Sequence, residues 1–272
     1  MPEIIQKNYS PPAGESKFFN NFGMKIIYIL WLRQLKRHVR SRSRMIGSLG
    51  QPLLFLVALG FGFGPIYQKA GGGSYIQFLA PGIIAMSILF TALFSGIEII
   101  WDRQFGFLKE TMVAPVSRFK IMFGRTLGGA TVALLQGVTV FVLSLIIGFH
   151  VENFTLLAPA LIFMFLIALM FAGLGTVIAS VLKDMQGFQL IMNFLVMPIF
   201  FLSGALFPLN NLPSAINIIA RLDPLSYGVD ALRGSLLING AHFGLLTDSI
   251  VLVTMVVALL ALGSYLFSRM EV

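Results

Sequence analysis

The sequence predicts an all-α integral membrane protein with six transmembrane helices, and three observations support this prediction. First, 57% of the 272 residues are hydrophobic and only 11% are charged, whereas about 25% of the residues in soluble domains are charged. Second, six uncharged runs are each long enough for a helix to cross the hydrocarbon core, which takes about 20 residues. Third, lysine and arginine lie mainly on one side of the predicted membrane.

The six uncharged runs define the predicted spans. They lie between Arg44 and Lys69, Lys69 and Glu98, Arg125 and Glu152, Glu152 and Lys183, Asp184 and Arg221, and Asp248 and Arg269. The fifth run is too long for one crossing and contains three prolines, so its span is expected to end at about Phe207. Together the spans form one membrane domain over residues 45–268, with no internal repeat.

Residues 208–240, after the fifth span, are expected to fold back at the outer membrane surface as a pair of short helices. Proline favours helix breaks near water, and backbone within lipid has to remain hydrogen-bonded. A plain exposed loop is the alternative interpretation of this segment.

The distribution of Lys and Arg predicts that both termini are cytoplasmic. With the N-terminus inside, the inner segments carry 16 of these residues and the outer segments carry 3. Residues 1–21 are then a cytoplasmic tail without the apolar core of a signal peptide, and residues 269–272 are the cytoplasmic C-terminus. The net charge of +8 flanks apolar runs, which indicates contact with membrane lipids and not with nucleic acid.

Residues 22–44 are predicted to form an amphipathic helix at the inner membrane interface. An apolar stripe at helical spacing consists of Tyr28, Leu32, Leu35 and Val39. A basic stripe consists of Arg33, Arg37, Arg40 and Arg44. The arginines would lie near anionic headgroups, and contact with a cytoplasmic partner is an additional interpretation.

Residue types that carry most catalytic chemistry are missing from the predicted spans. The chain has no cysteine and its three histidines are far apart in the sequence, so no metal site is predicted. The spans contain no carboxylate, which argues against an intramembrane enzyme and an ion-coupled carrier. Glu98 and Glu152 lie near span ends, and Glu98 is a candidate partner for an inner-surface arginine.

The inner loop 101–118 is the segment best suited to receive energy from a partner. The sequence has no GxxxxGK[ST] phosphate-binding motif, so any ATP dependence has to come from another polypeptide. The loop is predicted to contain a short surface helix capped by Asp102, with Phe105, Leu108 and Met112 on one face that enters a cleft of a moving partner. A loop whose aromatic side chains lie at the membrane surface is the alternative.

Two stretches of the sequence resemble the type 2 ABC exporter permease family, and the resemblance covers nearly the whole chain. The stretch 101–110, continuing into 114–118, is similar to the family's coupling loop between the second and third spans. The stretch 201–208, followed by 223–227 and Arg233, is similar to the family's signature ahead of the last span.

The resemblance implies roles for residues in both stretches. Those expected at the contact with the ATPase are Asp102, Arg103, Phe105, Gly106, Phe107, Leu108, Lys109, Glu110 and Met112. Those of the outer signature are Pro224, Leu225, Tyr227 and Arg233. Within that signature, Tyr227 and Arg233 are expected to cap or pair with Asp223 or Asp230.

The resemblance also implies a machine of two copies of this chain and two copies of a cytoplasmic ABC ATPase, in the plasma membrane of a prokaryote. ATP and magnesium would bind to the ATPase, so this chain would be non-catalytic and would bind no cofactor. The substrate path between the two copies would be lined by Phe90, Phe94, Met192, Phe200 and Phe201. The alternative is that these side chains only pack together or face lipid.

The cargo is the least constrained part of the prediction. Residues 78–83 are most similar to drug and antibiotic exporters of the daunorubicin-resistance kind, which implies an amphipathic or lipid-like substrate. Permeases for glycolipid or polysaccharide export share this stretch. An ion-coupled carrier or channel and a membrane scaffold are the alternatives outside the family.

Overall fold

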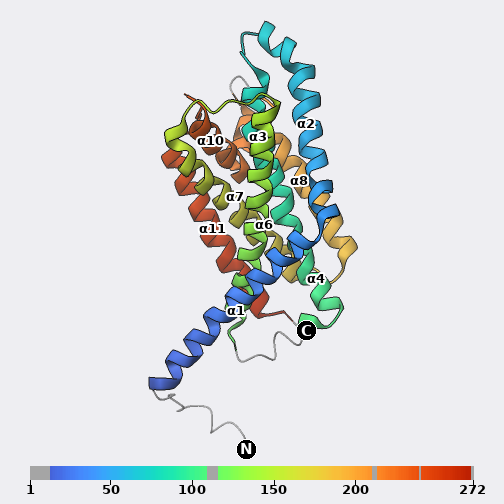
Figure 1. Ribbon diagram of the computed structural model, residues 1–272, viewed down its shortest axis with the longest axis vertical. Helices are drawn as coiled ribbons and strands as arrows, with labels where there is room; N and C mark the ends of the chain where they lie inside the picture. The colour runs from blue at the N-terminus through green and yellow to red at the C-terminus, as the bar shows by residue number, and fades with distance from the viewer. Residues whose placement is uncertain (1–12, 109–115, 210–212, 239, 271–272) are drawn as a thin grey trace, which may run out of the picture.

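The computed structural model describes residues 13–108, 116–209, 213–238 and 240–270, and these residues form a bundle of helices without a strand (Figure 1). The helices are α1 (Ala13–Arg40), α2 (Arg42–Lys69), α3 (Tyr75–Phe94), α4 (Ile97–Gln104), α6 (Arg118–Ile147), the 3-10 helix η1 (Phe154–Leu156), α7 (Leu157–Val181), α8 (Met185–Leu202), α9 (Ser214–Leu222), α10 (Pro224–Leu236) and α11 (Leu245–Ser268).

Six segments are long and apolar enough to cross a membrane, which confirms the predicted number of spans. They are α2, α3 with α4, α6, η1 with α7, α8, and α11. Both chain ends lie toward the end of the bundle that carries α4, and α10 lies at the opposite end (Figure 1). We call these the α4 end and the α10 end.

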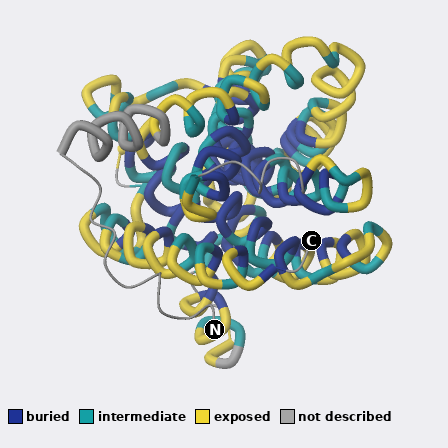
Figure 2. The backbone as a smooth tube through the Cα atoms, turned by 90° about the horizontal axis from the view of Figure 1, so that it is seen from below, coloured by how far each residue is buried: buried dark blue, intermediate teal, exposed yellow. Residues whose placement is uncertain are grey.

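The helices differ in how much of their surface the bundle covers. In the most apolar window of each segment, 67% of the residues are buried in α3–α4 and in α7, but only 17% are buried in α2 and 22% in α8 and α11. Figure 2 shows the buried residues gathered in the middle of the bundle, with exposed residues along the outward faces. The exposed apolar faces of α2, α8 and α11 suit contact with lipid or with a second membrane helix.

Small residues bring the α3–α4 junction against α7. A Cβ atom at Gly96 would overlap the carbonyl group of Gly175, and a Cβ atom at Gly175 would come within 2.5 Å of the carbonyl oxygen of Leu93. Close backbone approach at small residues is the usual way in which membrane helices gain packing contacts. The start of α4 is therefore fixed against the centre of the bundle.

Helix α1 packs against α6 with a different face from the apolar stripe predicted in the sequence. Gly124 and Gly128 of α6 lie directly against the backbone or side chains of Ile27 and Gln34. The indole of Trp31 donates a hydrogen bond to Thr131 Oγ1 at 3.0 Å. The predicted stripe residues Tyr28 and Val39 are 57% and 63% exposed. The helix ends at Arg40, and Arg44 belongs to α2.

The prediction of two short helices between the fifth and sixth spans is confirmed by α9 and α10. Helix α10 packs against α3, α7 and α11 and has a buried face. Its first turn is well specified, because Asp223 accepts a hydrogen bond from Leu225 N at 2.9 Å and Pro224 occupies the first helical position.

Candidate functional site

The segment that follows α4 exposes two aromatic rings at the α4 end. Phe105 is 71% exposed and Phe107 is 51% exposed, whereas Leu108 is fully buried. Gly106 between them has a φ of 79°, in the left-handed region that favours glycine. This conformation breaks the helical period, so the prediction that Phe105 and Leu108 share one face is wrong. The predicted contact residues Lys109, Glu110 and Met112 lie outside the described residues.

Asp102 connects α4 to two other helices by ion pairs. Its Oδ2 lies 2.7 Å from Nη2 of Arg125 in α6, and its Oδ1 lies 3.4 Å from Nη2 of Arg33 in α1. The side chains of Asp102 and Arg125 are only 9% and 4% exposed. The sequence analysis assigned Asp102 to a helix cap and treated Arg125 as the boundary of a span. The structure places both in a buried ion pair immediately before the exposed aromatic rings.

Glu98, one helical turn earlier, pairs with two arginines. Its Oε2 lies 3.5 Å from Nη1 of Arg37, and its Oε1 lies 3.9 Å from Nη1 of Arg44. The guanidinium of Arg37 also lies over the ring of Trp101, 5.3 Å from the centroid. The prediction that Glu98 pairs with an inner-surface arginine is confirmed.

Two further contacts tie the two ends of the loop 101–118 to distant helices. Gln104 lies 3.5 Å from the carbonyl oxygen of Lys183, between α7 and α8. Arg118 at the start of α6 donates hydrogen bonds to the carbonyl oxygens of Ser268 and Met270, at 2.6 and 3.3 Å. Any force on this segment would therefore reach α1, α6, α8 and α11.

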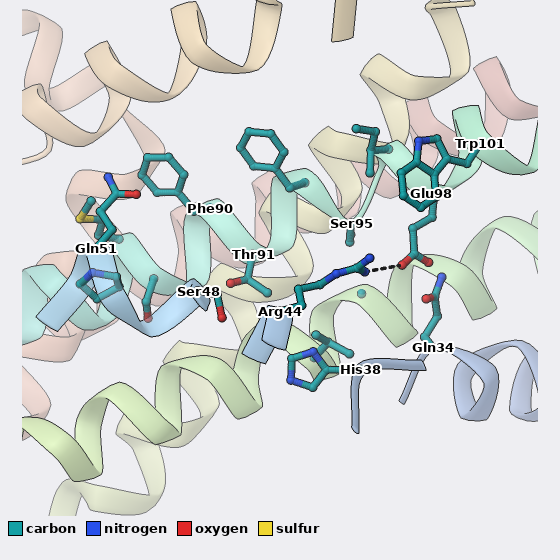
Figure 3. Close-up of a pocket in the computed structure, with 17 residues that line it drawn as sticks. Gln34, His38, Arg44, Ser48, Gln51, Phe90, Thr91, Ser95, Glu98 and Trp101 are labelled. Carbon is teal, nitrogen blue, oxygen red and sulfur yellow. Dashed lines mark ion pairs between the residues drawn. The ribbon is translucent and has the colours of Figure 1, made fainter. Parts of the chain in front are cut away.

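A cavity of about 450 Å³ lies beside the ion pairs, between α1, α2, α3, α4 and α6 (Figure 3). Arg44, His38, Gln34 and Glu98 gather at one end, and Figure 3 shows the side chain of Arg44 directed toward Glu98. Burial lowers the pKa of His38, and the positive charge of Arg44 lowers it further, while Glu98 acts in the opposite direction. His38 is therefore favoured in its neutral form.

Two of the five residues proposed for a substrate path lie on this cavity. Phe90 and Phe94 line it and stack on each other with ring centroids 6.4 Å apart. Met192 and Phe200 are buried in the packing of α8, and Phe201 is 42% exposed. The five side chains do not form one surface in a single copy of the chain, and their role as a path stays a prediction.

The predicted outer signature residues organise the α10 end, with partners other than those expected. Leu225 is fully buried. Tyr227 donates a hydrogen bond to the carbonyl oxygen of Arg221 at 2.8 Å. Arg233 donates to the carbonyl oxygens of Phe78 and Gly204, each at 3.2 Å, and stacks on the Phe78 ring at 4.0 Å. The prediction that Tyr227 and Arg233 pair with Asp223 or Asp230 is therefore wrong.

Burial shifts the titration of two groups in this region. It lowers the pKa of Arg233 to about 10, with the nearby Asp230 opposing the shift. It raises the pKa of Asp223 to about 7, although the hydrogen bond from Leu225 N favours the ionised form. Asp223 is therefore partly protonated at neutral pH.

Two buried carboxyl groups have contacts that the sequence did not indicate, since Asp230 was expected only as a partner of Tyr227 or Arg233, and Asp248 only marked a span boundary. Asp230 in α10 is 3% exposed and accepts hydrogen bonds from His242 N and Phe243 N, at 2.6 and 2.7 Å. Asp248 in the first turn of α11 is fully buried and interacts electrostatically with Asp230. The prediction that the spans contain no carboxylate is wrong, because Glu98 and Asp102 lie in the span formed by α3 and α4, and Asp248 lies in α11.

Within the described ranges, no three His, Asp or Glu side chains come together in an arrangement that could hold a metal ion. Glu98 and Asp102 at the α4 end instead pair with arginines, whereas Asp223, Asp230 and Arg233 at the α10 end bind backbone groups. The geometry of the described residues offers mechanical linkage and a cavity.

Comparison with known proteins identifies relatives over most of the chain. The family model described as "ABC-2 type transporter" matches residues 26–237. Nodulation protein J of Rhizobium leguminosarum bv. trifolii is 33% identical over 208 residues, which cover 76% of each chain. Nodulation protein J of Rhizobium meliloti is 31% identical over 75% of this chain and 80% of its own. A putative transport permease, ycf38 of Cyanophora paradoxa, is 29% identical over 78% of this chain and 74% of its own.

Proposed function

This chain belongs to the ABC-2 type transporter family as a multi-pass permease subunit, and we propose that it exports an amphipathic molecule by working with a separate ABC ATPase. In the proposed machine, two copies of the chain pair with two copies of the ATPase in the plasma membrane of a prokaryote. ATP and magnesium are bound by the ATPase, because the sequence contains no phosphate-binding loop of the GxxxxGK[ST] type.

The observation that carries this proposal is the exposed aromatic pair on a tethered segment. Phe105 and Phe107 are more than half exposed, which is costly for aromatic side chains in water and typical of a docking surface. The segment just before them is held by the buried pair between Asp102 and Arg125. Such a segment combines exposed aromatic side chains that can bind a partner with a buried ion pair that holds the segment in place, as a mechanical contact requires.

The tethers give the route by which ATPase movement reaches the spans. Displacement of the tip pulls on α4, and the ion pairs of Asp102 and Glu98 pass the displacement to α1, α2 and α6. The two membrane halves would then rock between states open to opposite sides, as in other two-state transporters. The exposed apolar faces of α2 and α8 are available for the second copy.

The proposed cargo is amphipathic or lipid-like, and a drug or antibiotic is the first candidate. A glycolipid or polysaccharide is the second candidate, and the mixture of charged and apolar residues around the cavity favours a cargo with a polar head. Neither substrate requires chemistry by this chain, which agrees with a non-catalytic subunit.

The test is purification of the tagged chain from its native membrane in mild detergent, followed by mass spectrometry. We expect one ABC ATPase per chain and ATP hydrolysis that depends on the permease. A Phe105→Ala, Phe107→Ala double variant should insert normally and lose at least about tenfold in permease-stimulated ATP hydrolysis, because two aromatic anchors are removed.

Phe119→Ala is the matched control, since Phe119 is 48% exposed and lies in α6, outside the proposed coupling segment 101–118. It should leave ATP hydrolysis unchanged. Normal hydrolysis in the double variant would overturn the coupling assignment. Reproducible absence of an ATPase, together with transport that follows an ion gradient, would favour a carrier, and absence of both would favour a scaffold.

A further inference from the structure

We propose that the cavity between α1, α2, α3 and α6 is a binding site for an amphiphile with an anionic, phosphate-like headgroup. Its charged end would hold the headgroup and its aromatic end would hold the first part of the hydrocarbon chain (Figure 3). The site lies within one copy of the chain and does not require the interface between copies.

Two arginines meet one carboxylate at the charged end of the cavity, with Arg44 in the lining and Arg37 just outside it. Arg37 and Arg44 share the single carboxylate of Glu98, and Arg37 is the closer of the two. Arg44 lies 3.9 Å from Glu98, at the limit of an ion pair, and its side chain is 52% exposed. An arginine in this position gains more from a phosphate group, whose oxygens accept two parallel N–H bonds, than from a carboxylate already paired elsewhere.

Neutral polar groups surround the same end without protein partners. Among the described residues, no side-chain hydrogen bond reaches the amide of Gln34 or the hydroxyl of Thr91, although both line the cavity. Polar groups in a recess normally find a partner in protein, water or ligand. Here they would supply donors to the remaining oxygens of a headgroup.

The other part of the cavity is apolar. It is lined by Pro52, Met86, Phe90 and Phe94. The rings of Phe90 and Phe94 are nearly parallel, with an angle of 2° between their planes. A volume of about 450 Å³ is within the usual range of ligand sites. It accommodates a headgroup and part of one hydrocarbon chain of the amphiphile. The rest of that hydrocarbon chain would extend along the exposed apolar faces of the helices.

The order of these residues along the chain matches the orientation of a lipid. Arg44 lies in the first turn of α2, and Pro52 lies two turns further along the same helix. Glu98 lies in α4, and Phe90 and Met86 precede it in α3, farther from the α4 end. The polarity of the wall therefore changes along the helix axes, as the polarity of a bilayer leaflet does.

Two sources offer the same ligand chemistry: a resident phospholipid of the membrane and the cargo itself. The binding site stands on the cavity alone, and only its identification as a cargo site rests on the proposed function. The experiment below separates these two sources and does not require the ATPase for its first arm.

The first arm uses Trp101, which lies on the cavity wall and is one of only two tryptophans. In a Trp31→Phe chain it is the sole indole. The purified chain is placed in nanodiscs that contain phosphatidic acid or phosphatidylcholine with brominated acyl chains, which quench indole fluorescence at short range. We expect half-maximal quenching at about tenfold lower mole fraction for phosphatidic acid, the size of one charge-assisted hydrogen bond.

Arg44→Gln in this background should remove the preference for phosphatidic acid. Arg42→Gln is the matched control, because Arg42 is an exposed arginine of the same helix that does not line the cavity, and it should retain the preference. Thr91→Phe, which fills the cavity without changing charge, should reduce quenching by both lipids. Equal quenching by the two lipids, or a preference that survives Arg44→Gln, would overturn the site.

The second arm repeats the phosphatidic acid titration on the complex with the ATPase. Stimulated ATP hydrolysis that Arg44→Gln lowers and Arg42→Gln does not would identify the anionic amphiphile as cargo. Unchanged hydrolysis with the quenching preference intact would identify a resident lipid. A complex without any ATP hydrolysis would count against the proposed function and leave the first arm as the measure of the site.

Discussion

The two ends of the bundle hold their charged side chains in different ways. At the α4 end, Glu98 and Asp102 face arginines from α1, α2 and α6, so side chains of one sign meet side chains of the other. At the α10 end, the carboxylates of Asp223, Asp230 and Glu152 instead accept hydrogen bonds from backbone N–H groups.

Three arginines repeat this contrast, although Arg118 at the α4 end also binds backbone carbonyl groups. Arg233 at the α10 end donates to two backbone carbonyl groups, whereas Arg33 and Arg37 at the α4 end depend on carboxylates. An ion pair made by an exposed side chain, such as that of Arg33 or Arg44, exchanges partners by rotamer changes on the nanosecond timescale. A side chain bound to the backbone of a loop fixes that loop in one conformation. We therefore expect the α4 end to rearrange during a transport cycle and the α10 end to move as a unit.

The largest expected effect comes from breaking the buried ion pair at the α4 end. Arg125→Met should lower the free energy of unfolding by about 3–5 kcal/mol, because it leaves the Asp102 carboxylate buried without its nearest partner. Thermal unfolding of the purified chain in detergent measures this loss.

Arg33→Met is the control for this prediction, because Arg33 is the other partner of Asp102 and its side chain is 48% exposed. A pair of this kind contributes at most about 1 kcal/mol. Adding Asp102→Asn to Arg125→Met should recover part of the stability, because the unpaired charge is then absent. Equal losses in the two single variants would mean that burial does not distinguish the pairs.

The next effect concerns the backbone contacts at the α10 end. Asp230→Ala should lower the free energy of unfolding by about 3 kcal/mol, since it removes two charge-assisted hydrogen bonds from His242 N and Phe243 N. Limited proteolysis should also cleave the α10–α11 loop more rapidly. Glu152→Ala, which loses a single bond from Ile238 N at an exposed site, should cost about 1 kcal/mol. Unchanged proteolysis in Asp230→Ala would contradict the proposed role of this carboxylate.

A smaller, pH-dependent effect is expected at Asp223. Its folded-state pKa of about 7 lies above the ordinary value of 3.8, so its contribution to stability is complete below pH 3.8 and is lost as the pH rises through 7. This pKa already includes the opposing effect of the hydrogen bond from Leu225 N, so the loss on ionisation is at most about 4 kcal/mol. Asp223→Asn should therefore stabilise the chain above pH 7, by no more than this amount.

The same Asp223→Asn variant should show no gain at pH 4, where the wild-type carboxyl group is protonated in the folded chain. Thermal unfolding at pH 4, 6 and 8 tests the trend. Stabilisation that is independent of pH would show that the effect arises from the cap geometry and not from the buried charge.

The number of spans and the two short helices were predictable from the sequence, because hydrophobicity and proline position act locally. The pairing of Arg125 with Asp102 was not predictable in the same way. A charge in an apolar run ends a predicted span, and only the folded bundle shows that α6 begins at Arg118 and buries Arg125 against a carboxylate. Asp248 was missed for the same reason.

The coupling segment illustrates a second limit of sequence analysis. Its identity was predicted from residue types, but its exposed face was assigned by helical spacing. Gly106 adopts a left-handed conformation, so Leu108 turns into the protein and Phe107 turns out.

At the α10 end, the spacing of Tyr227 and Arg233 suggested local pairing, whereas Arg233 reaches carbonyl groups of residues distant in the sequence. Backbone partners carry no signal in a single sequence.

The smallest expected effect is a change in the titration of His38, which reports on the charges at the cavity. Arg44→Gln should raise the pKa of His38, because it removes a cation that lowers it, and Glu98→Gln should lower the pKa further. Since the folded-state pKa lies below the ordinary value of 6.5, the contribution of His38 to stability is complete above pH 6.5 and declines as the pH falls below it.

NMR of ring-labelled histidine measures both pKa shifts of His38, with the signals of His150 and His242 as internal controls. Opposite shifts in the two variants would show that the charged end of the cavity responds to single charges, as binding of an anionic headgroup requires. No shift in either variant would show that Arg44 and Glu98 point away from His38 in the membrane, and the contrast between a rearranging α4 end and a fixed α10 end would lose its electrostatic basis.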